Sequence, residues 1–172
     1  GDISRIDNMV RCVRDDDRPQ VIVNGGITVN EGDTGAVIYA TVLETTDNDN
    51  SAAELTYTVT TTPQNGTLNL SGSVLSMDDT FTQADIDGSL LTYDHDGSET
   101  IADSFGFSVA DPTPNTVSGQ TFGVTVTPVN DPPAIDVNLG LKVKLGDTGT
   151  VITSAELSAS DPDHVDDELT YT

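Results

Sequence analysis

An internal repeat is the feature that most constrains how this chain can fold. A shift of 114 residues aligns residues 20–58 with residues 134–172 without a gap, and 18 of the 39 aligned positions are identical. The best-preserved stretch is EGDTGAVI at 31–38, which aligns with LGDTGTVI at 145–152. Self-similarity at a fixed spacing indicates that one structural unit recurs. We therefore predict a tail or linker at 1–18, a complete repeat at 19–131, and the first part of a second, truncated repeat at 132–172.

Within the complete repeat, apolar residues alternate with a period of two, which is typical of half-buried strands. The clearest stretches are AVIYATVL (36–43), LTYTVTTT (55–62), GFSVADP (106–112) and FGVTVTPV (122–129). Asn65-Gly66 predicts a hairpin turn between 55–62 and the TLNL that follows. Only FTQADIDG (81–88) predicts a helical turn, starting near Thr82 or Gln83. About seven short strands separated by turns predict an all-β sandwich.

The excess of carboxylates excludes several classes of partner. The chain carries 29 Asp and Glu against 6 Lys and Arg, for a formal net charge of -23, and residues 19–141 contain no Lys or Arg. Nucleic acid and anionic membrane surfaces would be repelled by this charge, and no apolar run is long enough to insert across a bilayer. Self-repulsion on this scale favours screening or bound cations, although the charge could also serve solubility alone.

Motifs for catalysis are missing from the sequence. Two histidines and one cysteine stand in no motif that links them to a nucleophile, and neither G-x-S-x-G nor H-E-x-x-H occurs. Glycoside hydrolysis would need facing carboxylates and aromatic platforms for the sugar, but the chain has no Trp. We therefore do not expect an enzyme.

Oxygen-bearing side chains gather at the repeat boundaries and in paired positions. Asp47-x-Asp49 is mirrored by Asp161-x-Asp163, and Asn130-Asp131 aligns with Asp16-Asp17. Calcium takes six to eight such oxygens, and alternate side chains on a loop can converge on one ion. The remaining candidates are Glu31, Asp96 and Asp103. Asp and Asn also build turns without any ion, and Leu145 stands where the second copy would repeat Glu31. Glu31 is therefore either a local ligand or an exposed acid.

Several segments in order resemble the chondroitin sulfate proteoglycan repeat. These are PQNGTL, FTQADIDGSLLTYDHDGSETIADSFGFSVAD and FGVTVTPVNDPP, which cover most of residues 20–131. That repeat is a cadherin-like module of animal matrix and surface proteins and of very large bacterial surface adhesins. The resemblance implies a seven-stranded Greek-key sandwich, cadherin- or immunoglobulin-like, in tandem arrays with calcium at the junctions.

Carried onto this sequence, the resemblance implies two calcium sites. The junction between the copies would use Asn130, Asp131, Asp161 and Asp163, with Asp96, Asp103 and Glu31 as possible additions. The preceding junction would use Asp16, Asp17, Asp47 and Asp49. The linker NDPP offers fewer ligands than the cadherin pattern, which is richer in alternating Asp and Asn.

The leading MVRCVRDDD (9–17) resembles the closing segment of formylglycine-generating-enzyme-like and fibrobacterial domains of secreted bacterial proteins. Together these features predict a calcium-binding, cadherin-like repeat of a secreted or surface-anchored multidomain bacterial adhesin, which it would extend away from the cell. Its partners would be neighbouring repeats and a cell-surface protein or glycan. The alternative is a non-catalytic spacer or accessory module of a secreted polysaccharide-degrading enzyme.

Overall fold

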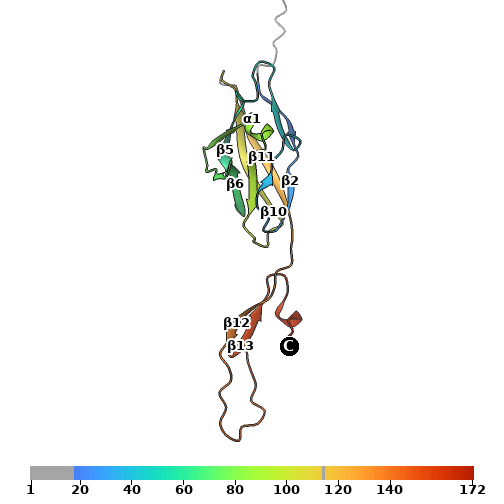
Figure 1. The fold of residues 1–172 in the computed structure, drawn as a ribbon, viewed down its shortest axis with the longest axis vertical. Coiled ribbons are helices and arrows are strands. Elements are labelled where there is room, and N and C mark those ends of the chain that lie inside the picture. Colours follow the sequence, from blue (N-terminus) through green and yellow to red (C-terminus); the bar gives the residue numbers. More distant parts are fainter. Residues whose placement is uncertain (1–17, 114) are drawn as a thin grey trace, which may run out of the picture.

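Strands account for nearly all the regular structure, and alternate residues of the longer strands face one core. The computed structural model describes residues 18–113 and 115–172 (Figure 1). The larger sheet has the order β2 (Ile27–Asn30), β11 (Thr116–Thr127), β10 (Ala102–Ala110), β5 (Thr56–Thr61) and β8 (Thr80–Thr82). The second sheet has the order β3 (Ala36–Val37), β9 (Leu91–His95), β6 (Gly66–Leu70) and β7 (Ser73–Val74). A short pair joins β1 (Gln20–Asn24) to β4 (Leu43–Thr46).

Aromatic rings, which bury large apolar areas, pack among Val, Ile and Leu side chains in the core between the two sheets. Tyr57 stacks on Phe81 with ring centroids 4.8 Å apart, and Phe105 contacts Phe122 at 5.2 Å. Leu68, Leu91 and Tyr93 of the second sheet are also completely buried. The predicted all-β sandwich is thus confirmed, although residues 20–127 divide into eleven strands, some only two residues long, and not into seven.

A glycine pair explains one of these divisions, between β1 and β2. Gly26 has φ of +72°, and a Cβ there would lie 2.6 Å from the carbonyl oxygen of Gly123. A residue without a side chain is therefore needed at this bend. Beyond it, the chain leaves its antiparallel partner β4 and pairs in parallel with β11.

The prediction of one strand over 36–43 is wrong in its second half. Within 36–43, β3 covers only Ala36 and Val37, and β4 begins at Leu43. A turn separates them, because the carbonyl oxygen of Tyr39 accepts hydrogen bonds from the backbone N–H groups of Val42 and Leu43, at 2.9 and 3.1 Å. The resulting turn carries the chain from the second sheet to β4.

The hairpin predicted at Asn65-Gly66 is also wrong, because β5 and β6 belong to different sheets. The backbone N–H groups of Gln64 and Asn65 donate to the Asp103 carboxylate, each at 3.0 Å, and this contact redirects the chain. A side chain from a distant strand therefore replaces the cross-strand bonds that a two-residue turn would make.

The predicted helical turn is confirmed as α1 (Gln83–Asp87), with Thr82 as its N-cap. Thr82 Oγ1 accepts from the backbone N–H of Asp85, and Asp85 Oδ2 accepts from that of Thr82, which makes a reciprocal capping box. No helix in the described part of the chain has the length and apolar character needed to cross a membrane.

The C-terminal segment, residues 132–172, contains β12 (Ala134–Asn138), β13 (Leu157–Ser160) and a 3₁₀ turn, η1 (Asp166–Glu168). The pairing of β12 with β13 reproduces that of β1 with β4 at a spacing of 114 residues, including the irregularity after the second pair. Tyr171, which aligns with the buried Tyr57, is 54% exposed. The described C-terminal segment contains no counterparts of β8 and β10, whose phenylalanines cover Tyr57.

Candidate metal centre at the junction

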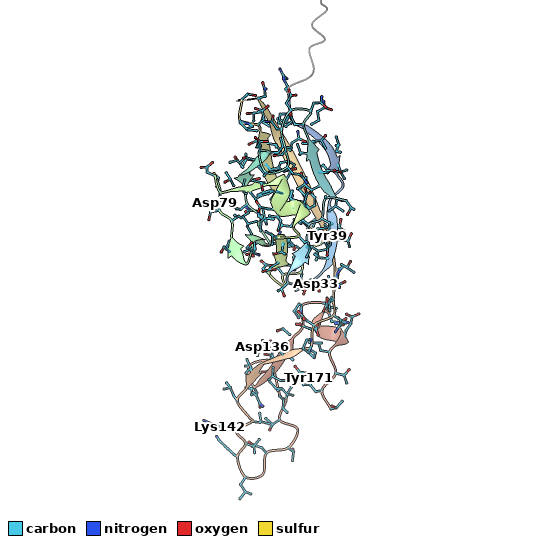
Figure 2. The ribbon with its side chains drawn as sticks, turned by 45° about the horizontal axis from the view of Figure 1, so that its top comes forward. Asp33, Tyr39, Asp79, Asp136, Lys142 and Tyr171 are labelled. Atoms are coloured by element: carbon cyan, nitrogen blue, oxygen red, sulfur yellow. The ribbon has the colours of Figure 1, made fainter. Side chains whose placement is uncertain are left out.

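Three carboxylates meet where the sandwich joins the C-terminal segment. Glu31 follows β2, Glu99 lies in the loop between β9 and β10, and Asp131 belongs to the linker. One carboxylate oxygen from each lies within 4.8 Å of the others. The linker leaves the sandwich at this end, which Asp33 marks in Figure 2. We call the three residues together with Asp163 the junction cluster.

Asp163 joins the cluster through a main-chain contact. Its Oδ2 accepts a hydrogen bond from the backbone N–H of Asp131 at 2.6 Å. Asp161 supports this position, because its Oδ1 accepts from the backbone N–H of Asp163 at 2.9 Å and lies 3.0 Å from Nδ1 of His164. The Asp161 side chain is only 2% exposed. The hydrogen bond with His164 lowers the pKa of Asp161 and raises the pKa of the imidazole.

Negative charge in the junction cluster is poorly compensated. Oε2 of Glu31 accepts from the backbone N–H of Val129 at 3.2 Å, whereas Oε1 is buried and accepts no hydrogen bond from any described residue. Partial loss of hydration, followed by the charges of Glu31, Asp163 and Asp131, raises the pKa of Glu99.

One basic side chain near the cluster is that of His164, which bonds Asp161 and whose pKa the charge of Asp163 also raises. Lys142 stands near the end of the C-terminal segment that is remote from the junction (Figure 2). Carboxylate oxygens that crowd together with so little positive charge among the described residues are chemically suited to a hard divalent cation. Their donor set contains no nitrogen or sulfur atom of the kind that zinc prefers.

Two other predicted ligands have structural contacts of their own. Oδ1 of Asp103 accepts from the backbone N–H of Gln64, and its Oδ2 accepts from the backbone N–H of Asn65 and, at 2.9 Å, from the hydroxyl of Tyr93. Asp96 accepts from the backbone N–H of Ser98 at 3.0 Å, and its hydrogen bonds with Ser98 lower its pKa. Neither belongs to the group of three that converge.

Asn130 was predicted as a linker ligand. Its Nδ2 donates to the carbonyl oxygen of Asp131 at 2.9 Å, so the amide braces the linker next to the cluster.

Of the residues predicted for the preceding junction, Asp47 and Asp49 lie beside the start of β1, at the end of the sandwich opposite the junction cluster. Asp47 follows β4, and its Oδ1 accepts from the backbone N–H groups of Asp49 and Asn50 at 2.8 and 3.2 Å. This is the same turn that Asp161 makes in the C-terminal segment. The Oδ2 atom of Asp47 is buried and has no partner among the described residues. Asp16 and Asp17 lie outside the described residues, as does the whole MVRCVRDDD segment.

Sequence reasoning missed Glu99, the residue that completes the converging group. It lies in DHDGSE, three positions after Asp96, which was predicted as a candidate ligand. No spacing connects it with Glu31, because the two are 68 positions apart and meet only through the packing of β2, β9 and β11. The loops that follow β2 and β9 lie at the same end of the sandwich. Knowledge of this strand arrangement would have indicated that acidic residues in the two loops lie close together.

A cadherin-like β-sandwich that carries a carboxylate cluster at its outgoing linker is the class that this fold and site define. A family model described as cadherin-like matches residues 19–126. The chain belongs to this cadherin-like family.

Large animal matrix proteins are among its relatives. It is 34% identical over 174 residues to the human extracellular matrix organizing protein FRAS1 and 34% identical over 172 residues to extracellular matrix protein 3 of Lytechinus variegatus. Each match covers 91% of this chain, but only 4% and 5% of those proteins. Human chondroitin sulfate proteoglycan 4 is 36% identical over 110 residues, which cover 64% of this chain and 4% of that protein. These relatives confirm the predicted resemblance at the level of the repeat and agree with an extracellular location.

Proposed function

We propose that the chain is a calcium-binding spacer and adhesion module, in which a cation at the junction cluster fixes one repeat relative to the next. The observation that carries this proposal is the convergence of Glu31 and Glu99 from the sandwich with Asp131 from the linker. Asp163, from the C-terminal segment, is bonded to the same linker residue. A cation bound there would therefore contact all three parts of the chain.

Electrostatics supports a stiffening role for the ion. Without a cation, the carboxylates repel one another and drive the two parts of the chain to separate. A bound Ca²⁺ ion would replace this repulsion with shared coordination by hard oxygen ligands. Pro132 and Pro133 further limit the bend of the linker because their φ angles are fixed. Only Glu31, Glu99, Asp131 and Asp163 are assigned as candidate ligands here, with Asp161 as a support.

A second site of the same kind is proposed at the other end of the sandwich. Asp47 and Asp49 form the same turn as Asp161 and Asp163, and Asp16 and Asp17 align with the linker residues Asn130 and Asp131. The buried Oδ2 of Asp47, which has no described partner, supports the assignment. The repeated pairing register of β1–β4 and β12–β13 supports a tandem arrangement of cadherin-like units.

The module would work outside the cell and without catalysis. Relatives that are named as matrix proteins and a proteoglycan support contacts with neighbouring repeats and with surface proteins or glycans. That the chain comes from a bacterial adhesin, preceded by a domain of the formylglycine-generating-enzyme type, stays a prediction from the sequence.

A thermal melt of residues 1–172 in millimolar calcium, in excess chelator and in magnesium tests the proposal. A ligand that binds only the folded state adds about 2.7 kcal/mol of stability at a hundredfold excess over its Kd. We expect a calcium-selective rise in Tm that Glu99→Gln reduces. An identical Tm in calcium and chelator would refute specific sites and favour the alternative of a simple spacer in a secreted enzyme.

A further inference from the structure

One buried imidazole lies behind the two loops that carry the sandwich carboxylates. His95, the last residue of β9, is 4% exposed. Its Nδ1 accepts hydrogen bonds from the backbone N–H groups of Gly32 and Gly97, at 3.1 and 3.2 Å. Its Nε2 lies 3.1 Å from Oγ1 of Thr100. A neutral ring that carries its proton on Nε2 satisfies all three contacts, because Nδ1 must then be the acceptor.

The partners of this ring are the chain neighbours of the candidate ligands. Gly32 directly follows Glu31, and Thr100 directly follows Glu99. A further bond, from the backbone N–H of His95 to the carbonyl oxygen of Asp33 at 2.9 Å, ties the first loop to β9. The two loops are far apart in sequence, and His95 links the backbone N–H of the residue beside Glu31 to the side-chain hydroxyl of the residue beside Glu99.

We infer that His95 is a positioning residue for the junction cluster, which holds Glu31 and Glu99 at a fixed separation before a cation arrives. Two carboxylates at close range repel each other, so the loops that bear them must be held by other contacts. Residues that orient metal ligands from behind have large effects on affinity, typically about 10–100-fold on substitution. The inference rests on the proposed calcium site and adds to it the group that preorganises that site.

Two substitutions separate the positioning role from simple core packing. His95→Phe keeps a planar ring but leaves the N–H groups of Gly32 and Gly97 without an acceptor. His95→Asn retains an oxygen that can take the place of Nδ1 and loses only the contact with Thr100. Tyr57→Phe is the matched control, because it removes a buried polar group that bonds Thr45 and Gln83 in the core and touches no residue of the cluster.

Calcium titration calorimetry on residues 1–172, below the melting temperature of every variant, provides the test. We expect His95→Phe to weaken calcium binding at the junction by about tenfold or more, His95→Asn to restore most of that loss, and Tyr57→Phe to lower Tm without changing the Kd. If Glu99→Gln weakens binding while His95→Phe does no more than Tyr57→Phe, the positioning role is refuted and the calcium site stands. If Glu99→Gln leaves the titration unchanged, the proposed site fails and the positioning role fails with it.

A ¹⁵N-detected NMR spectrum of the imidazole nitrogens gives a second test that survives poor folding of the Phe variant. The chain has only two histidines, so His164→Gln assigns the signals. At neutral pH in chelator we expect His95 to have an unprotonated Nδ1 and a protonated Nε2. A proton on Nδ1 would overturn the arrangement, because that atom could not then accept from Gly32 and Gly97.

Discussion

The backbone N–H of Asp131 donates to Oδ2 of Asp163 across 2.6 Å, and this bond joins the linker to a loop 32 residues further along the chain. One oxygen of Asp163 is thereby held beside the linker carboxylate, next to Glu31 and Glu99 of the sandwich. Main-chain donors thus bring acidic side chains together that would otherwise repel one another. Because of this crowding, removal of one carboxylate charge should raise the Tm of the calcium-free protein, whereas removal of calcium should lower the Tm of the wild type.

Glu99→Gln is expected to raise the Tm of the protein in chelator and to lower the gain in Tm on adding calcium. The first effect follows because one of several neighbouring negative charges disappears, and the second because a candidate ligand is lost. Calcium affinity should fall by about tenfold or more, since ligand charge sets the affinity of such sites over several decades. Asp167→Asn, which removes an exposed acid of η1, serves as the control and should change neither quantity markedly. Equal shifts for the two variants would contradict the prediction.

The pKa of Glu99 gives a pH prediction for the calcium-free protein. Partial loss of hydration and the neighbouring carboxylates raise it above the ordinary 4.5. A carboxyl with a raised folded pKa contributes stability that is complete below its unfolded pKa and is lost as the pH rises through its folded pKa. An NMR titration of the side-chain carboxyl carbon should therefore find a midpoint above 4.5 in chelator and a lower one in calcium. A midpoint that calcium does not move would place the ion elsewhere.

Asp161 should show the opposite behaviour. Its hydrogen bond with His164 lowers its pKa below the ordinary 3.8. Its contribution to stability is therefore present above the unfolded pKa and is lost as the pH falls through the folded one. Carboxyl titrations of the wild type and of His164→Gln provide the measurement, and removal of the imidazole should move the midpoint of Asp161 upward.

The sequence predicted the parts of this molecule that depend on local pattern. Alternation of apolar residues identified β5, β10 and β11, and the helical turn predicted in FTQADIDG, starting near Thr82 or Gln83, is α1. Failures occurred where distant side chains decided the outcome. The Asp103 carboxylate accepts hydrogen bonds from the backbone N–H groups of Gln64 and Asn65, and the predicted hairpin is instead a connection between the two sheets.

The candidate site divided in the same way. Asp131 and Asp163 were predicted from the repeat and lie together at the junction. Asp103 was predicted as well, but its carboxylate accepts hydrogen bonds from residues within the sandwich. Glu99 could be assigned only after the packing of the strands brought its loop next to Glu31. Residue type indicated oxygen ligands, but the fold decided which of them converge.

Tyr57→Phe is expected to destabilise the sandwich by about 1–2 kcal/mol, because it removes the buried hydroxyl that hydrogen-bonds with Oγ1 of Thr45 and Oε1 of Gln83, and Gln83 Oε1 then keeps only the backbone N–H of Thr45. Urea unfolding in chelator measures the change, and Tyr39→Phe, at a residue that is 52% exposed, is the control. Burial raises the pKa of Tyr57 to about 12. The stability of the wild type should therefore fall as the pH rises above 10 toward that value, and Tyr57→Phe should weaken this dependence. An unaltered dependence would mean that another group is responsible.

Gly26→Ala should cost clearly more stability than Gly119→Ala. Both glycines have positive φ, of +72° and +70°, so each substitution carries the strain of a left-handed backbone, about 1–2 kcal/mol. Only at position 26 would the added methyl group meet backbone, the carbonyl oxygen of Gly123, whereas nothing lies within 4 Å at position 119. Urea unfolding of the two variants isolates the clash by difference. Equal losses would show that the bend between β1 and β2 can relax.

Calcium should narrow the range of orientations between the sandwich and the C-terminal segment. Spin labels at Ser73→Cys in β7 and Thr150→Cys, both exposed positions, report the distance across the junction, with Cys12→Ser removing the native thiol. In chelator the repelling carboxylates leave only the prolines and the Asp131–Asp163 bond to hold the linker, so the distance distribution should be broad. In calcium it should become narrow, and Glu99→Gln should restore part of the breadth. A control pair on the surface of the sandwich alone, Ser73→Cys with Ser118→Cys, should give the same distance distribution with and without calcium. A junction distribution that is equally broad in calcium and in chelator would mean that the ion, if bound, does not stiffen the linker.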